Sequence, residues 1–193
     1  PVAGGWTSQL RNSLGRLRAE EDGVTAISFV LVFQRFMFFF FMTFESGMAN
    51  LRQVMLERGV DLAVREVRIG TLSEPTVDDL RERICDIAGV IPRCESQLRI
   101  EMLRRDVRNW VPVRSSVQCV NRDQDDQDAE TFDEYGNNEL MYLRVCARID
   151  PVLPTTGIGR RISNSDDAAA GGSFALVSAA AFVIEPFRAD DDL

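Results

Sequence analysis

The sequence has 193 residues and a net charge of -8, its basic residues are all arginine, and it contains no histidine. This length allows one domain with appendages or two small domains. The acidic balance argues against nucleic-acid binding, which needs a basic face. The lack of histidine removes both the commonest general base and the commonest zinc ligand.

A polar leader, residues 1–23, precedes an apolar block at residues 24–44, where eight of the twelve phenylalanines lie between Phe29 and Phe44. This block is close to the roughly 20 residues that a spanning helix needs. Its valine, isoleucine, leucine and phenylalanine residues favour insertion by about 4 to 8 kcal/mol, and Arg35 near the centre opposes it by about 2.5 to 3.5 kcal/mol. We therefore predict a transmembrane helix. The alternative is a buried core helix, but phenylalanines on all sides of a helix need a deeper core than this chain offers.

The charges that flank the apolar block predict its orientation. Arg11, Arg16 and Arg18 precede the block, and the first basic residue after it is Arg52. Positive charge concentrates on the cytoplasmic side of a span. We therefore expect a cytoplasmic N-terminus and residues 45–193 on the other side of the membrane.

The junction between the leader and the block has a specific layout. The leader ends in Gly23, and the apolar helix begins immediately at Val24. No A-x-A-like cleavage site follows the apolar run, so a secretory signal peptide is not indicated. A prepilin-type leader, cut after the glycine, has this layout. The alternative is an uncut membrane anchor.

The four cysteines are Cys85, Cys94, Cys119 and Cys146. None forms a CxxC pair, so neither a zinc site nor a thioredoxin-type site is indicated. An even number of spaced cysteines suits disulfides in an oxidising compartment, and four buried thiols are the alternative. Among three possible pairings, we prefer Cys85–Cys94 with Cys119–Cys146, because this pairing has the shortest loops in total.

Residues 45–193 are expected to form an α+β domain. Helical spacing extends the first helix over 45–63 with one apolar face, made of Met48, Leu51, Val54, Met55 and Leu62. The segment 63–70 predicts a strand, and "VDDLRERICDIAG" predicts a helix capped by Thr76 or Ser73. Further strands are predicted at 96–103, at 140–149 and within 173–187. Four strands, one crossover helix and the long first helix indicate a largely antiparallel sheet.

An acidic loop, residues 121–138, resembles part of a calcium-binding loop. Asp123, Asp125 and Glu134 fall at positions one, three and twelve, but position six, which needs glycine, is Asp128. A solvated loop is the alternative, so we predict no firm metal site and no cofactor. The polar tail, residues 188–193, is expected to fray.

Several segments together resemble the TadE-like proteins of the tight-adherence (Tad/Flp) pilus system. They are "RAEEDGVTAISFVLVF", "FESGMANLRQVMLERGVDLAVREVRIGT", "LRERICDIAGVIPRCESQLRIEM", "DVRNW", "LMYLRVCARIDPVLPTTGIG" and "SAAAFVIEP", within residues 16–187. These relatives are minor pseudopilins of bacterial inner membranes. The resemblance implies a single-pass inner-membrane protein with a periplasmic head. Its implied partners are other pilus assembly proteins, pseudopilins and a prepilin peptidase that cuts between Gly23 and Val24.

Two positions depart from the family pattern. Pseudopilins usually carry glutamate five residues after the cleavage glycine, where this chain has Ser28, and the family commonly has proline where Gln34 stands. The resemblance therefore does not imply that this chain is incorporated into a filament. We expect Arg35 to face a carboxylate on a partner's membrane helix, since intramembrane charges usually find partners. The alternative is that it faces lipid and snorkels.

Three functions follow from these features. The first is a membrane-anchored pilus assembly protein that works through protein contacts and is not an enzyme. The second is an anchored calcium-binding or adhesive module that uses the acidic loop. The third is an anchored periplasmic enzyme, for which carboxylates such as Glu95 and Glu101 can be imagined but which no motif supports.

Overall fold

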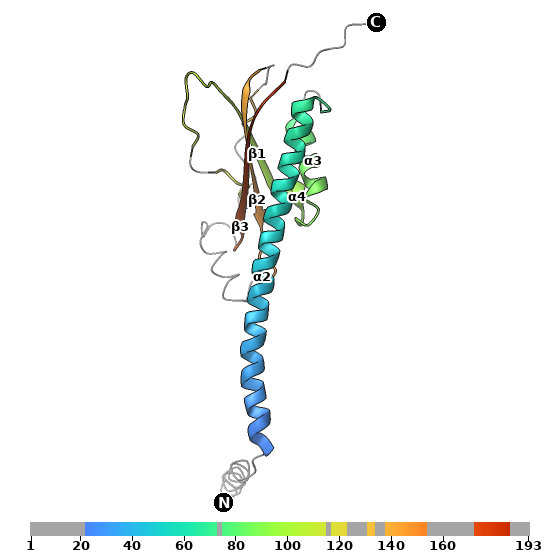
Figure 1. Cartoon of the computed structure of the whole chain (residues 1–193), viewed down its shortest axis with the longest axis vertical. Coiled ribbons are helices and arrows are strands. Elements are labelled where there is room, and N and C mark those ends of the chain that lie inside the picture. The colour runs from blue at the N-terminus through green and yellow to red at the C-terminus, as the bar shows by residue number, and fades with distance from the viewer. Residues whose placement is uncertain are drawn as a thin grey trace, which may run out of the picture. The chain divides into compact units, whose positions relative to one another are not determined.

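The computed structural model describes residues 22–72, 75–114, 117–122, 131–133, 138–153 and 172–185. The chain divides into two units, residues 1–43 and 44–193. The described elements are α2 (Asp22–Ile69), α3 (Val77–Ile87), α4 (Cys94–Gln97), β1 (Leu98–Arg105), β2 (Leu140–Ile149) and β3 (Phe174–Val183) (Figure 1). A long N-terminal helix with a small antiparallel sheet confirms the predicted α+β fold.

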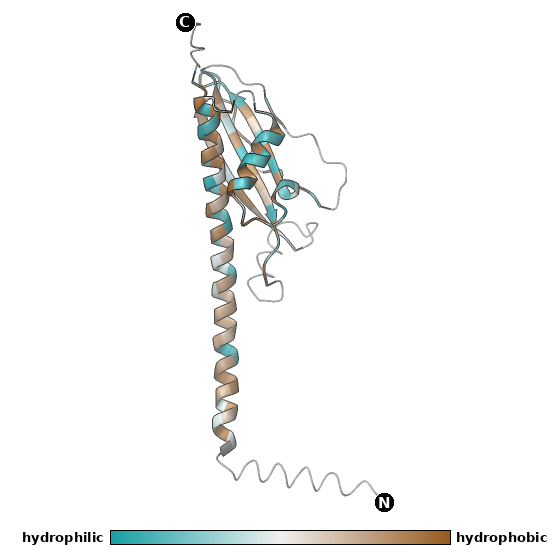
Figure 2. Ribbon diagram, turned by 90° about the vertical axis from the view of Figure 1, so that its right-hand side faces the viewer, coloured by the Kyte–Doolittle hydropathy of each residue, from teal (hydrophilic) through white to brown (hydrophobic). Residues whose placement is uncertain are grey.

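In the first unit, α2 leaves its large apolar side chains exposed. Phe29, Phe36 and Phe39 are 64%, 62% and 68% exposed. This part of α2 is mostly brown, the colour of hydrophobic residues, in Figure 2. The helix contains a window of mean hydropathy 1.9 of which no residue is buried, so it is long and apolar enough to cross a membrane.

In the second unit, α2 continues to Ile69, so the predicted strand at 63–70 is wrong and the helix is longer than predicted. Ala63, Val64 and Val67 are buried on the same helical face as Leu56 and Val60. Packing of this face overrides the strand preference of valine. Gly70, at a φ of 72°, follows the helix where a left-handed residue commonly ends one.

The apolar face predicted for this part of α2 was also largely wrong. Leu51 and Val54 are 44% and 57% exposed, and Met48, Met55 and Leu62 are half-buried. The buried face lies one position further round the helix. It includes Gly59, where an added Cβ would lie 3.0 Å from the carbonyl oxygen of Ile84 on α3. The small residue at 59 allows α2 and α3 to approach closely, which selects this face.

Helix α3 has the predicted N-terminal cap. The Thr76 hydroxyl accepts the N–H of Asp79 at 3.2 Å, and the Asp79 carboxylate accepts the Thr76 N–H at 2.9 Å. This reciprocal arrangement satisfies two backbone donors at the start of the helix. Ser73, the other cap considered, lies outside the described residues.

The sheet has the order β1-β2-β3, and both strand pairs are antiparallel. Strand β2 matches the predicted segment 140–149. Its core face packs with α2 and α3 through the predicted alternate residues Met141, Leu143, Val145, Ala147 and Ile149. Beyond the three strands, the described residues add one isolated bridge, between Met102 and Phe132. The fourth predicted strand is absent because its residues belong to α2.

The other side of the sheet, called the outer face, is partly covered by the segment that follows β1. Arg144 of β2 is 5% exposed, pairs with Glu101 of β1 and donates to the Arg114 carbonyl at 2.7 Å. A disulfide joins Cys119 of the covering segment to Cys146 of β2. On β3 the outer face stays open, since Ala179, Ala181 and Val183 are exposed.

Candidate functional sites

The proposed processing junction lies in the first turn of α2, which begins at Asp22. Among the described residues, nothing lies within 4 Å of a Cβ added at Gly23, and Val24 is 61% exposed. The junction is therefore sterically open on the helix surface. The first turn of a helix has N–H groups without intrahelical partners and frays readily.

The three predicted contact positions in the apolar block are all exposed. Ser28, Gln34 and Arg35 lie on the surface of α2. Residues seven apart fall on nearly the same side of a helix, so Ser28 and Arg35 share one face. A partner helix on that face would meet a hydroxyl and a guanidinium two turns apart.

The cysteines form two disulfides, in the pairing that the sequence favours. Cys85 of α3 joins Cys94 at the start of α4, with their Cα atoms 5.6 Å apart. Cys119 joins Cys146 of β2, with their Cα atoms 5.3 Å apart. Such bonds persist in oxidising compartments. The two bonds fix the connection between α3 and α4 and the segment that crosses the outer face.

The calcium-loop candidates Asp123, Asp125 and Glu134 lie outside the described residues. Among the residues that are described, no group of three histidine, cysteine, aspartate or glutamate side chains could hold a metal ion. Glu95 and Glu101, imagined as catalytic carboxylates, are not brought together. Glu101 is instead occupied by Arg144, with 2.9 Å between Oε2 and the arginine Nε.

A buried carboxylate at Glu45 holds the segment that follows β2. Glu45 is 2% exposed. Its two oxygens each accept a backbone N–H at 2.8 Å, one from Val152 and one from Leu153. These charge-assisted bonds offset the cost of burying the carboxylate. Sequence reasoning missed this contact, because nothing local marks a partner more than a hundred residues away.

Arginines gather around Asp150 at the end of β2. Arg122 pairs with the Asp150 carboxylate, and Arg93 approaches it at 3.5 Å. Arg52 of α2 donates to the Asp150 carbonyl at 3.1 Å, and Arg122 donates to Gln97 of α4 at 2.7 Å. The cluster joins α2, α4 and β2, so we assign it a structural role.

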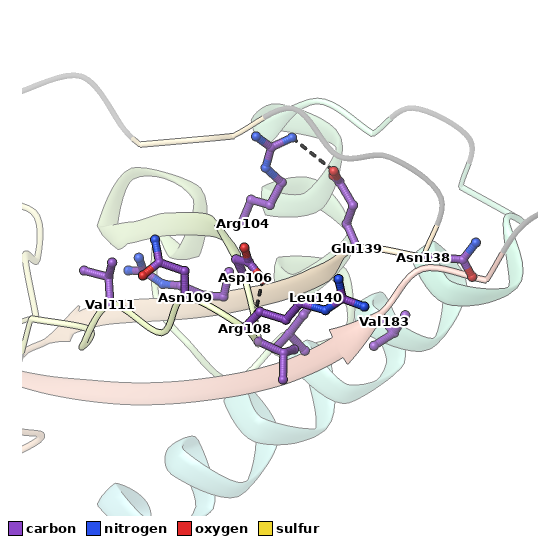
Figure 3. Close-up of a pocket in the computed structure, with 11 residues that line it drawn as sticks. Arg104, Asp106, Arg108, Asn109, Val111, Asn138, Glu139, Leu140 and Val183 are labelled. Carbon is purple, nitrogen blue, oxygen red and sulfur yellow. Dashed lines mark hydrogen bonds and ion pairs between the residues drawn. The ribbon is translucent and has the colours of Figure 1, made fainter.

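A cavity of about 660 Å³ lies at the opposite end of the sheet, beside the segment that follows β1 (Figure 3). Its lining combines arginine, acidic, amide and aliphatic side chains from Arg104–Asn109, Val111, Asn138–Leu140 and Val183. Arg104 pairs with Glu139 at 3.0 Å. Sequence reasoning did not single out this site, because its walls come from three separate parts of the chain.

No protein-family model matches the chain, and neither a curated protein nor a solved structure does. The family resemblance described above therefore rests on the sequence segments alone.

Proposed function

We propose that this chain is a membrane-anchored, minor pseudopilin-like protein that assists assembly of a Tad/Flp-type pilus through protein–protein contacts. It would lie in the bacterial inner membrane, with the N-terminus in the cytoplasm and residues 45–193 in the periplasm. The resemblance to TadE-like proteins is the basis for the pilus assignment. The observation that carries the anchoring is the apolar part of α2, whose large side chains are exposed.

Two structural features support this proposal. The exposed phenylalanines of α2 suit a lipid environment. The two disulfides suit an oxidising compartment such as the periplasm. Within the membrane, Ser28, Gln34 and Arg35 are the proposed contact residues for a partner helix.

The proposal is tested by the intact mass of the protein after co-expression with its cognate prepilin peptidase. We expect loss of every residue up to Gly23. The matched control is Gly23→Leu, which should block cleavage while leaving α2 intact, because no atom of the described residues lies within 4 Å of a Cβ at this position. An uncut wild-type chain would instead indicate a fixed membrane anchor and would contradict the pseudopilin assignment.

A further inference from the structure

The cavity at the end of the sheet is built on one row of the outer face. Arg105 of β1 is paired with Leu140 of β2, and Leu140 is paired with Val183 of β3. Because side chains of paired residues point to the same face, these three side chains form a row across the sheet. The segment from Asp106 to Val111 runs beside the row and completes the lining.

The charges in this cavity are not balanced. Arg104 is paired with Glu139, and the Asp106 carboxylate accepts the backbone N–H of Arg108 at 2.8 Å (Figure 3). Within the described part of the chain, the Arg105 and Arg108 guanidinium groups have no carboxylate partner, and the buried Nε of Arg105 has no hydrogen-bond acceptor. A buried donor without an acceptor costs free energy. The cavity therefore offers cationic donors that a bound anion would satisfy.

Part of the cavity lining is apolar, and this part lies at the edge strand of the sheet. Leu140, Val111 and Val183 supply aliphatic surface, and Val183 is 43% exposed on β3, the last strand of the sheet. Elsewhere on the same strand, the Val177 carbonyl accepts a hydrogen bond from the side chain of Gln53 of α2 at 3.0 Å, so main-chain groups of β3 can accept donors from outside the sheet. An extended segment can add to such an edge through main-chain hydrogen bonds.

We propose that this cavity binds an extended acidic segment of a partner protein, in which an aspartate or glutamate is next to an aliphatic residue. The carboxylate would be held by Arg105 and Arg108, since guanidinium groups match carboxylates in charge and geometry. The aliphatic side chain would contact Leu140 and Val183. This inference uses the cavity alone and does not depend on the pilus assignment.

The aliphatic part of the lining argues against a free inorganic anion as the ligand. Such an anion would make no use of Leu140, Val111 and Val183.

The test uses the full chain in nanodiscs of zwitterionic phosphatidylcholine. Trp6→Phe leaves Trp110, between the lining residues Asn109 and Val111, as the sole tryptophan. The probe is the peptide acetyl-Ala-Asp-Asp-Leu-Ala-amide, and its matched control replaces both aspartates with asparagine. We expect a saturable change in Trp110 fluorescence with the acidic peptide. The asparagine peptide should bind about tenfold more weakly, the loss expected when a charge-assisted contact is removed.

Variants locate the site. The double variant Arg105→Gln/Arg108→Gln should weaken acidic-peptide binding at least about tenfold. Arg58→Gln, an exposed arginine on α2 at the other face of the sheet, should leave it unchanged. Val183→Asp places a negative charge in the lining and should abolish binding, although neither arginine is substituted. Each variant is first checked for both disulfides by mass and for its circular dichroism spectrum.

Three results would overturn the proposal. The first is equal affinity for the acidic and asparagine peptides. The second is unchanged binding in the folded variants, and Val183→Asp decides this point if the arginine variant does not fold. The third is full displacement of the peptide by inorganic phosphate at equal concentration, which would mark a site for small anions rather than for a protein segment.

Discussion

The two parts of α2 differ in how their apolar residues are placed. Before residue 44, phenylalanines occupy every side of the helix, and Phe39 is 68% exposed. From residue 44 on, apolar and polar residues separate, and Leu56 and Val60 are 0% exposed. Both parts are equally helical. Helix formation alone therefore says nothing about the environment, whereas the angular distribution of side chains does.

This difference indicates what the apolar side chains of each part of α2 contact. The second part buries its apolar face within its own unit, against α3 and the sheet. In the first part, no residue of the apolar window is buried. Its apolar surface is therefore available to lipid or to another protein. Substitutions of apolar residues should therefore destabilise the second unit strongly in the second part of α2 and hardly at all in the first.

The largest difference is expected between Leu56→Ala and Phe39→Ala. Leu56 is fully buried, so its truncation should lower the free energy of unfolding of the second unit by about 3 kcal/mol. Phe39→Ala removes more atoms but should change that free energy by less than about 0.5 kcal/mol. The measurement is a urea titration of the full chain in nonionic detergent, followed by near-UV circular dichroism. Equal losses of unfolding free energy in both variants would show that the first part of α2 also packs within the second unit.

A smaller effect with a sign change is expected at two glycines of the same helix. At Gly47 an added Cβ has no described residue within 4 Å, whereas at Gly59 it meets the Ile84 carbonyl oxygen at 3.0 Å. Gly47→Ala should stabilise the second unit by about 0.5 to 1 kcal/mol through helix propensity. Gly59→Ala should destabilise it by about 1 kcal/mol, because backbone must shift. The same urea titration measures both, and stabilisation by both alanines would contradict the close approach of α2 and α3.

Local signals in the sequence predicted the elements that depend on local chemistry. The strict alternation of residues 140–149 gave the bounds of β2, and a cap at Thr76 or Ser73 with acidic residues in the following turn indicated the start of α3. The segment 63–70 failed because it alternates and is also helical in spacing, and only packing against α3 and the sheet decides between the two. The prediction of the buried face of α2 was largely wrong for the same reason, because packing decides which face is buried.

The candidate sites show the same limit. The apolar block stood out in the sequence because composition alone marks a helix that is long and apolar enough to cross a membrane, and its proposed contact residues stay predictions. The Glu45 contact and the cavity were not identifiable, because each joins residues far apart in the chain. For Arg105, no local pattern distinguishes it from the other arginines. Its place in the row with Leu140 and Val183 follows from strand register.

The smallest expected effect is a pH dependence that belongs to the second part of α2. Glu66 is hydrogen-bonded to Arg83 of α3, with 2.8 Å between Oε2 and Nε. The hydrogen bonds from Arg83 hold the pKa of Glu66 below its ordinary value of 4.5, although partial burial opposes this. A folded-state pKa below the unfolded value means that the pair stabilises the fold above about pH 4.5 and that this contribution is lost as the pH falls further.

Because the Arg83 side chain is 42% exposed, solvent screening should keep the contribution small. Glu66→Gln should therefore lower the urea midpoint more at about pH 7 than at about pH 3.5, because the contribution of the wild-type carboxylate is lost as the pH falls through its lowered folded-state pKa. Glu57→Gln, which removes the same charge from an exposed position of the same helix, is the matched control and lacks an arginine partner among the described residues. If Glu66→Gln were equally costly at both pH values, the loss would come from packing rather than from the ion pair. The contact between α2 and α3 would then be steric at Glu66 as it is at Gly59.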